Sequence, residues 1–240
     1  METRLNKYLS ECGFCSRREA DRLIEANRVT INDAIPELGT KVKDGDIVKV
    51  DGKAVSSQEE FVYIALYKPI GITSTTDKTD PTNIVDFMKY RKRIFHIGRL
   101  DKDSEGLILM TNDGDIVNKI LRANNNHEKE YIVQVDQSVT DDFIYGMENG
   151  VPILDTVTKK CKVQRMNDKT FRIVLTEGLN RQIRRMCSHF DFKVERLKRV
   201  RVMNIKLDVP KGKWRYLKEE EMKELNSLLK DSLKTEEASR

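Results

Sequence analysis

A run of seven apolar residues, Phe61–Tyr67, restricts the fold more than any other feature of the sequence. A continuous apolar run of this length is typical of a strand that is buried within a sheet. The segment Lys68–Gly71 must then turn, because Pro69 removes a hydrogen-bond donor and Gly71 frees the backbone angle φ. Strand and helix patterns follow without regular alternation. The sequence therefore predicts an α+β fold, in which flanking helices accompany a mostly antiparallel mixed sheet.

The other elements of this part of the chain are predicted from apolar periodicity and turn residues. Further strands are expected over residues 96–100, 107–110, 131–135, 160–166, 171–175 and 194–207. Helices are expected over residues 115–122, 141–147, 180–190 and 219–229. Thr140 is placed to cap the second of these helices.

Residues 1–55 are predicted to form a separate small unit. Two short helical patterns come first, over residues 4–12 and then from Ser16, which has the spacing of a capping box with Glu19. Short strands are expected over residues 29–31 and 42–50. The linker is expected over residues 56–62, of which residues 56–60 are polar, with residues 63–229 as a second domain and residues 230–240 as a disordered tail.

The positive charge of the chain is concentrated in one block. Residues 179–206 hold nine Lys or Arg against two acidic residues, a local charge of +7 in a chain whose net charge is +5, so that the remaining residues sum to −2. Such a block is typical of a surface that contacts a polyanion, although a solvated helix face is the ordinary alternative. We therefore expect a nucleic acid as the partner.

Several classes of protein are excluded by what the sequence lacks. No apolar run reaches the ~20 residues that span a bilayer, and the first residues have no apolar signal segment. Four cysteines are too few for a disulfide scaffold, and Cys12 and Cys15 lack the second ligand pair of a zinc site. No glycine-rich phosphate loop occurs. We expect a cytoplasmic protein with reduced thiols, no metal and no membrane partner.

Asp101 is the candidate for the chemistry, because three histidines leave few options for acid–base catalysis. It ends the run His96–Asp101, in which an apolar strand leads into a polar loop. Arg99, or the distant Arg184, could hold its carboxylate ionised. On spacing alone, an ordinary turn aspartate is an equally good interpretation.

Longer motifs around Asp101 carry a resemblance to a known family. Residues 96–114, HIGRLDKDSEGLILMTNDG, resemble the GRLD-x-x-T/S-x-GL-x-x-x-TNDG motif of the RsuA-type ribosomal RNA pseudouridine synthases. Lys68–Gly71 resembles their KP-x-G turn, Lys129–Tyr131 their K-x-Y segment, and Asn180–Met186 their NRQIRRM helix.

The resemblance extends beyond these motifs. Residues 4–50 are similar to the S4 RNA-binding domain that precedes the catalytic domain in this branch of the family. Residues 126–131 and 150–163 are most similar to its RluF subtype, which modifies large-subunit ribosomal RNA. The resemblance therefore spans nearly the whole chain from Arg4 to about residue 225.

The resemblance implies that the protein isomerises uridine in RNA, by breaking the N1–C1′ bond and rejoining the ring through C5. No group enters or leaves, so no cofactor is implied. Asp101 would be the essential carboxylate, which either attacks the sugar C1′ or removes a sugar proton, and Arg184 would be its ion-pair partner. Tyr131 would stack on the target base and act on the C5 proton, and Leu197 would line the base pocket. An ordinary sheet tyrosine and a core leucine are the alternatives.

The target uridine must leave its base stack before it can react. Arg99 is expected to fill the vacated space with its planar guanidinium. Further substrate contacts are expected from Lys129, Asn180, Arg181, Gln182 and Arg185. Contacts between the S4-like unit and RNA are expected from Arg4, Lys7, Arg17, Arg18 and Arg22, which could instead merely solvate the two short helices.

The substrate that the resemblance implies is large-subunit (23S) ribosomal RNA, either free or within an assembling subunit. A transfer RNA is left open as a second substrate, and the protein is expected to be a monomer. Two other functions stay open: a non-catalytic factor for ribosomal RNA binding or ribosome assembly on the same scaffold, and a carboxylate-dependent RNA glycosidase that would release free uracil.

Overall fold

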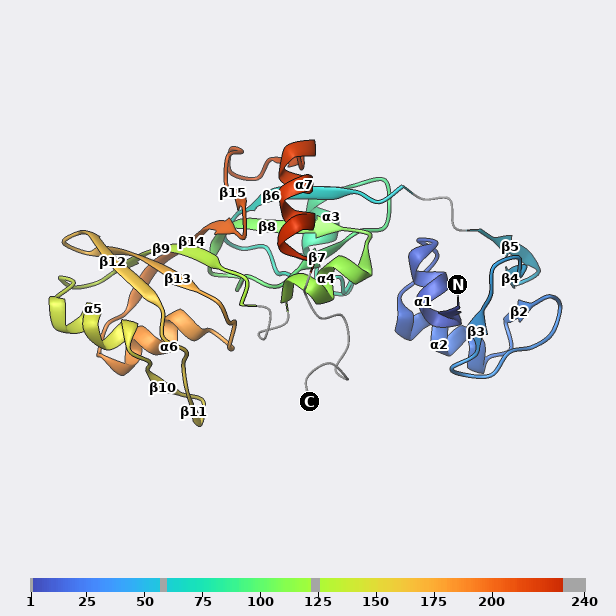
Figure 1. The fold of residues 1–240 in the computed structure, drawn as a ribbon, viewed down its shortest axis with the longest axis horizontal. Coiled ribbons are helices and arrows are strands. Elements are labelled where there is room, and N and C mark those ends of the chain that lie inside the picture. Colours follow the sequence, from blue (N-terminus) through green and yellow to red (C-terminus); the bar gives the residue numbers. More distant parts are fainter. Residues whose placement is uncertain (1, 57–59, 122–125, 231–240) are drawn as a thin grey trace. The chain divides into compact units, whose positions relative to one another are not determined.

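The computed structural model describes residues 2–56, 60–121 and 126–230 (Figure 1). The chain divides into two compact units: residues 1–62 with 90–94 and 112–114 form one, and the rest of the chain forms the other. The predicted linker includes residues 57–59 and the predicted tail includes residues 231–240, which lie outside the described residues. The domain boundaries drawn from the sequence therefore stay predictions.

The first unit is a small α+β fold with a core of its own. Its elements are β1 (Thr3–Arg4), α1 (Leu5–Glu11), α2 (Arg17–Glu25), β2 (Val29–Ile31), β3 (Lys41–Val42), β4 (Val48–Val50) and β5 (Lys53–Val55). Leu9 and Leu23 of the two helices pack in one buried cluster with Val29 and Val48 of the strands. The predicted cap of α2 is confirmed, because the Ser16 side chain accepts a hydrogen bond from the Glu19 N–H.

The second unit is built on a large sheet. Among the described residues, the strand order is β12-β13-β9-β14-β8-β6-β16, with β7 and β15 paired to β8 and β14. The pairing of β14 with β8 is parallel, and the other pairings of this sheet are antiparallel. This confirms the predicted fold class. The elements are β6 (Tyr63–Lys68), α3 (Ile84–Met88), β7 (Phe95–Ile97), β8 (Glu105–Thr111), α4 (Gly114–Leu121), β9 (Lys129–Val135), α5 (Asp141–Glu148), β10 (Pro152–Ile153), β11 (Thr156–Val157), β12 (Lys162–Asn167), β13 (Thr170–Leu175), α6 (Gln182–His189), β14 (Val194–Val202), β15 (Ile205–Lys206), β16 (Trp214–Tyr216) and α7 (Glu219–Leu228).

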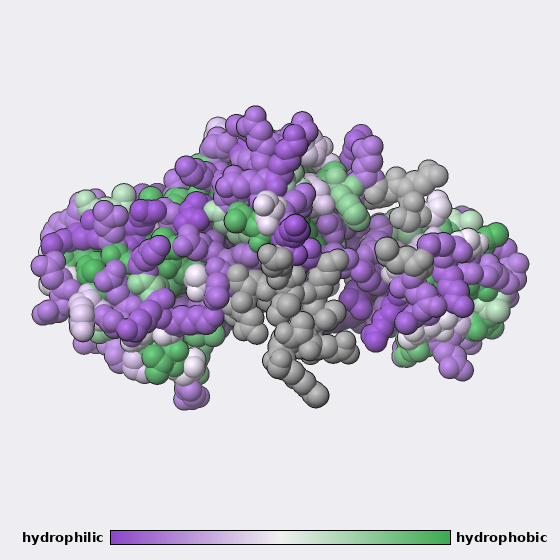
Figure 2. All heavy atoms as spheres, in the orientation of Figure 1, coloured by the Kyte–Doolittle hydropathy of each residue, from purple (hydrophilic) through white to green (hydrophobic). Residues whose placement is uncertain are grey.

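Helices lie against both ends of this sheet. In Figure 1, α4 and α7 lie beside the β6–β8 end, and α5 and α6 beside the β12–β13 end. Ile120 of α4 and Leu225 of α7 share a buried cluster with Leu107 and Leu109 of β8. Burial of this apolar surface holds the helices on the sheet. Hydrophilic residues cover most of the face of the molecule that Figure 2 shows.

Aromatic packing fixes the position of α6. The Phe143 ring of α5 lies 5.3 Å from the Phe171 ring of β13, 5.8 Å from the Phe190 ring and 4.2 Å from the Phe192 ring. Phe190 is the C-terminal cap residue of α6. Offset and edge-to-face ring contacts of this kind stabilise a packed core, so α6 is held firmly at one end.

Several elements differ from their predicted limits. β7 ends at Ile97 rather than at Leu100, because Gly98 turns the backbone with a φ of 71°. The predicted strand over residues 194–207 is a hairpin of β14 and β15, which turns at Met203 with a φ of 51°. The predicted helix over residues 180–190 begins at Gln182, since Arg181 is left-handed. Short elements such as α3 and β16 were not predicted.

Gly106 allows β8 to approach β14 closely. Its φ is 116°, and a Cβ on this residue would overlap the backbone of Arg199. A side chain here would therefore force the two parallel strands apart, in addition to straining the backbone.

We predict that Gly106→Ala lowers the free energy of unfolding by about 2–4 kcal/mol, as expected for combined backbone strain and overpacking. Urea unfolding would measure this. Gly178→Ala is the matched control, because a Cβ on Gly178 meets nothing within 4 Å, and its stability should stay within about 0.5 kcal/mol of the parent. Equal stability of the two variants would contradict the close strand approach.

Candidate active site

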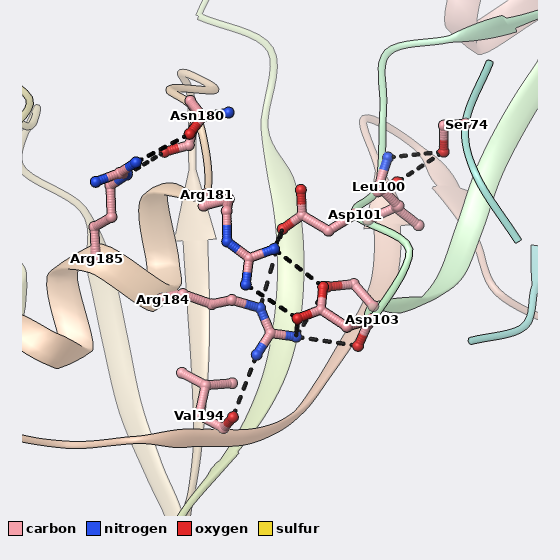
Figure 3. Close-up of polar contacts among 10 residues, drawn as sticks. Ser74, Leu100, Asp101, Asp103, Asn180, Arg181, Arg184, Arg185 and Val194 are labelled. Atoms are coloured by element: carbon pink, nitrogen blue, oxygen red, sulfur yellow. Dashed lines mark hydrogen bonds and ion pairs between the residues drawn. The ribbon is translucent and has the colours of Figure 1, made fainter. Parts of the chain in front are cut away.

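Asp101 lies in the loop between β7 and β8, and this loop is fixed by side-chain and backbone hydrogen bonds. The Leu100 N–H donates to the Ser74 hydroxyl oxygen at 3.1 Å, and that hydroxyl donates to the Leu100 carbonyl at 2.8 Å (Figure 3). The Ser104 N–H donates to the Asp101 carbonyl at 3.0 Å. The sequence predicted that a strand delivers Asp101; a turn pinned by Ser74 does so instead.

Two arginines of the α6 segment face this loop (Figure 3). Arg181 Nη1 lies 3.3 Å from Asp101 Oδ2, and Arg184 Nε lies 4.0 Å from the same oxygen. Arg181 also donates to both carboxylate oxygens of Asp103, at 3.2 and 3.0 Å. The structure therefore brings together Asp101 and the arginine expected as its partner, and it adds Arg181 and Asp103 to the cluster.

Arg184 ties several parts of the chain together. Its Nη2 donates to the Asp103 carbonyl at 3.1 Å and to the Ser104 hydroxyl at 3.2 Å, and its Nη1 donates to the Val194 carbonyl at 3.2 Å. Only 13% of its side chain is exposed, against 41% for Arg181. Arg184 thus links the start of β8 to the start of β14, while Arg181 remains open to solvent.

A cavity of about 490 Å³ opens beside Asp101. Arg99, Lys102 and Arg181 line it, and the turn that contains Ile70 and Gly71 closes it on another side. Arg99, the residue expected to fill a vacated base stack, is exposed at this opening. The cavity can therefore admit a polar ligand with negative charge to the vicinity of the carboxylate.

Lys68 is a buried cation of this site that the sequence analysis treated only as part of a turn. Its side chain is fully buried, and its Nζ donates to the Pro69 carbonyl at 2.9 Å and to the Ile72 carbonyl at 2.8 Å. Burial lowers the pKa of Lys68 to about 8, and the nearby Asp101 carboxylate opposes this shift. Hydropathy could not have revealed this residue, because a lysine after a strand usually faces solvent.

Tyr131 is placed near the site by strand register. Lys68 pairs with Gly106, Gly106 with Arg199, and Arg199 with Tyr131, so these positions form one row across β6, β8, β14 and β9. Adjacent strands are about 4.8 Å apart, so the Tyr131 backbone lies roughly two strand spacings from Gly106, where the Asp101 loop has just entered the sheet.

Tyr131, Leu197 and Lys129 are all buried within this part of the sheet. Leu197 pairs with Val133, and this pair lies two residues along the strands from the pair of Arg199 with Tyr131. Burial and the positive charge of Arg199 lower the pKa of Lys129 to about 8. Tyr131 and Leu197, which are expected to contact the base, and Lys129, which is expected to contact the substrate, therefore lie inside the sheet rather than at the exposed rim of the cavity.

The other candidates on α6 lie outside the ion-pair cluster. Arg185 donates to the Asn180 carbonyl at 3.0 Å and to its side-chain oxygen at 3.2 Å, and Figure 3 shows this pair apart from Asp101. Gln182 is buried, donates to Glu177 at 2.8 Å and accepts from the Leu179 N–H at 3.0 Å. These contacts show Gln182 closing the loop before α6.

The basic block of residues 179–206 is only partly exposed. Arg199 is buried, and Arg201 is held by Glu128 and Glu130 at 2.8 Å each. The exposed basic side chains of the block are Arg181, Arg185, Lys193, Arg196 and Lys206. The surface that can meet a polyanion is thus smaller than the sequence count suggests.

The basic residues singled out in the first unit lie mainly at its surface. Arg4, Arg17, Arg18 and Arg22 are exposed. Lys7 lies 3.4 Å from Glu11, and Arg22 lies 3.2 Å from Glu19. Exposed ion pairs of this kind contribute little to stability, so Lys7 and Arg22 remain able to exchange their glutamate partners for phosphate.

Three further features bear on function. The described residues contain no group of three or more His, Cys, Asp or Glu side chains placed to hold a metal ion. Burial raises the pKa of Cys161 and of Cys187 to about 12, which makes both thiols poor nucleophiles. No helix in the described part of the chain is both long and apolar enough to cross a membrane.

Comparison with known proteins gives consistent matches. The chain matches the family model described as RNA pseudouridylate synthase over residues 62–189 and the S4 domain model over residues 3–48. It is 57% identical over 232 residues to the dual-specificity RNA pseudouridine synthase RluF of Shigella flexneri, covering 95% of this chain and 80% of that protein. It is 36% identical to the ribosomal large subunit pseudouridine synthase B of Vibrio vulnificus, covering 95% of this chain and 75% of that protein. A crystal structure of a pseudouridylate synthase matches with a TM-score of 0.68 at 26% identity, over 92% of this chain and 99% of that one.

The lowered pKa of Lys68 makes the stability of the protein depend on pH. Between about pH 8 and pH 10.4, the unfolded chain keeps a proton on Lys68 that the folded protein has released. Raising the pH through this range therefore favours the folded state. We predict that the parent protein gains on the order of 1–3 kcal/mol relative to Lys68→Met from pH 7.5 to pH 10.

Chemical unfolding at a series of pH values would measure this difference. Lys78→Met, at an exposed position, is the control and should follow the parent protein over the same range. A constant difference between the parent and Lys68→Met from pH 7.5 to pH 10 would contradict the burial of a titrating ammonium group.

Proposed function

Because this chain belongs to the RNA pseudouridylate synthase family, we propose that it converts uridine to pseudouridine in large-subunit (23S) ribosomal RNA, with Asp101 as the reacting carboxylate. Family membership makes the protein an RNA pseudouridine synthase of the RluF kind, as the resemblance in its sequence implied. The RNA target and the roles of single residues are the proposal. The observation that carries it is the meeting of Asp101, Arg181 and Arg184 beside an open cavity.

The reaction is balanced within the substrate. The N1–C1′ bond breaks, a C5–C1′ bond forms, the C5 proton leaves, and N1 takes up a proton. No redox change and no co-reactant are required, so the site needs a carboxylate, a proton acceptor and a means of holding the base. Asp101 would act at the sugar, either by attack on C1′ or by removing a sugar proton.

Arg181 and Arg184 support the role of Asp101 by position and charge. Both guanidinium groups lie within 4.0 Å of Asp101 Oδ2. Positive charge at this distance attracts the carboxylate and so helps to hold it in place. Arg184 would act as a fixed cation because its other nitrogens are bound to the chain.

The target base must be extruded from its helix to reach Asp101. Arg99 lies exposed at the mouth of the same cavity, where its planar guanidinium would replace the extruded base in the stack. Tyr131 and Leu197 would then contact the base, and movement of a proton from C5 would take place near Tyr131. Their burial in the free protein means that the base would enter by displacing neighbouring side chains rather than by filling an open slot.

RNA binding would use both units of the chain. Arg181 and Arg185 offer exposed guanidinium groups at the start of α6. The remaining substrate contacts would come from Lys129, Asn180 and Gln182. The S4 match covers Arg4, Lys7, Arg17, Arg18 and Arg22, which would contact RNA phosphates. Phosphate contacts fix register and affinity without reading sequence.

The choice of large-subunit ribosomal RNA draws on the relatives. The Vibrio vulnificus protein is named for the ribosomal large subunit, and the Shigella flexneri protein is named as dual-specificity. We propose the same class of target here, with a transfer RNA as the second substrate to test. A protein with this substrate would act in the cytoplasm, and we propose that it acts there as a monomer.

The central test of the proposal is Asp101→Asn. We predict that this variant forms pseudouridine in 23S transcripts at least about 10³-fold more slowly, because the amide can neither attack C1′ nor accept a proton. Its affinity for RNA should change by less than about threefold, since the side chain keeps its shape. Asp168→Asn, in the exposed turn between β12 and β13, should retain the parent rate.

The product assay separates the alternatives. Unchanged pseudouridine formation by Asp101→Asn would overturn the assignment of the carboxylate. Release of free uracil by the parent protein would instead indicate a glycosidase, and RNA binding without either product would indicate a non-catalytic factor.

The RNA-facing side of α6 makes a separate prediction. Arg185→Ala should weaken RNA binding and reduce the slope of log K against log salt concentration by about one unit, as expected for one lost phosphate contact. Lys223→Ala, on the exposed side of α7, is the control and should leave the slope unchanged. Identical slopes for the parent and Arg185→Ala would exclude this side chain from the RNA interface.

A further inference from the structure

A second carboxylate, Asp103, lies two residues after Asp101, accepts two hydrogen bonds from Arg181 and forms an ion pair with Arg184. Arg181 donates to both of its oxygens, at 3.2 and 3.0 Å, in a bidentate pair. Arg184 Nη2 lies 3.4 Å from Asp103 Oδ2 and donates to the Asp103 carbonyl at 3.1 Å. Half of the Asp103 side chain is exposed, so burial does not impose this arrangement.

Asp101 receives much less from the same arginines. It has ion-pair contacts of 3.3 Å with Arg181 and 4.0 Å with Arg184, but neither guanidinium hydrogen-bonds to it among the described residues. Arg184 Nε, which lies 4.0 Å from Asp101 Oδ2, is buried and has no hydrogen-bond partner among the described residues. Two arginines thus lie beside Asp101, while the hydrogen bonds of Arg181 go to Asp103 and those of Arg184 go to Asp103, Ser104 and Val194.

This division matters for reactivity. A carboxylate in a bidentate pair with arginine uses its lone pairs in two charge-assisted hydrogen bonds. Those lone pairs would have to be released before the carboxylate could attack a carbon or accept a proton. A carboxylate with only ion-pair contacts keeps the benefit of nearby positive charge and leaves its lone pairs available.

We propose that Asp103 is a positioning residue, whose carboxylate accepts the hydrogen bonds of Arg181 and forms an ion pair with Arg184, and so keeps both arginines beside Asp101 without letting them bind its reacting oxygens. This inference rests on the proposed role of Asp101. Asp103 does not touch the reacting atoms; it acts through the arginines. It also neutralises one of the two positive charges, so that the four side chains carry no net charge together.

The charge state of Asp103 agrees with this role. The hydrogen bonds from Arg181 hold the pKa of the Asp103 carboxyl below its ordinary value, and the charge of Arg184 lowers it further, against a smaller opposing effect of burial. Asp103 therefore stays ionised over the whole neutral range and holds its arginines there.

Asp103→Asn is the informative substitution, because it removes the charge and one acceptor oxygen while keeping the size of the side chain. Arg181, which is exposed enough to move, should then form its bidentate pair with Asp101. We expect the single-turnover rate of pseudouridine formation at saturating protein to fall about tenfold or more. The affinity for RNA should be unchanged or higher, since a negative charge is lost beside the RNA-facing arginines.

A double variant distinguishes positioning from a merely structural role. If Asp103→Asn slows the reaction because Arg181 captures Asp101, then removing Arg181 as well should restore part of the rate. Asp103→Asn with Arg181→Ala should therefore react at least about threefold faster than Asp103→Asn alone at saturating protein, although it binds RNA more weakly. Asp103→Glu keeps the negative charge and both carboxylate oxygens, and should retain most of the parent rate.

The matched control is Asp191→Asn, which removes an equal charge from the same side of the protein. Asp191 lines a cavity with Arg181 and Arg184, but the ion pairs of these arginines are with Asp101 and Asp103. Its rate should match that of the parent. Thermal unfolding of each variant would show that the variants are folded at the temperature of the rate measurement.

The outcomes separate this inference from the proposed function. A parent-like rate for Asp103→Asn, or a double variant slower than Asp103→Asn alone, would overturn the positioning role. If Asp101→Asn is inactive in the same assay, the proposed function survives that result. If Asp101→Asn remains active, the proposed function fails and the positioning role fails with it.

Discussion

The site depends on one ion-pair cluster, in which Asp101 and Asp103 of a loop face Arg181 and Arg184 of the α6 segment. The two partners Asp103 and Arg181 are 78 positions apart in the chain, so the cluster exists only when the sheet is complete. Arg184 is mostly buried and ties the starts of β8 and β14 together, whereas Arg181 is more exposed. One arginine therefore anchors the loop, and the other binds Asp103 from a more exposed position.

The rest of the second unit serves to hold this cluster in place. Gly106 lets β8 lie against the β14 backbone in the parallel pair of the sheet. Beyond the end of β7, the Ser74 hydroxyl accepts a hydrogen bond from the Leu100 N–H and donates one to the Leu100 carbonyl. The rings around Phe143 fix the far end of α6. Each contact removes freedom from a segment that carries a charged group, so the charges meet without a rearrangement of the backbone.

Much of the fold could be predicted because its signals are local. The buried run before Lys68 and the caps at Ser16 and Thr140 predicted elements that the structure contains. The strand β16 was missed because it is three residues long and exists through pairing with β6. β7 was predicted too long, since apolar residues continue beyond the point where Gly98 turns the chain.

The site was only partly accessible from the sequence. Motif resemblance predicted the pairing of Asp101 with Arg184, because those residues lie in long contiguous patterns, but it placed Arg181 only among the substrate contacts. The contacts of Asp103 with the arginines could not be predicted, because they depend on the distance between two segments that are far apart in the chain, and no sequence period encodes that distance. The burial of Lys68 was missed for the same reason: the side chain looks like the start of a turn, and only the folded sheet encloses it.

The most direct measurement is a structure of the protein bound to a target RNA hairpin in which the reacting uridine carries fluorine at C5, so that the normal loss of the C5 proton is blocked. We expect an extruded nucleotide in the cavity, with a carboxylate oxygen of Asp101 bonded to C1′ or within about 3.5 Å of the sugar, and the base against Tyr131. A nucleotide bound with its sugar remote from Asp101, or left stacked in its helix, would contradict this expectation.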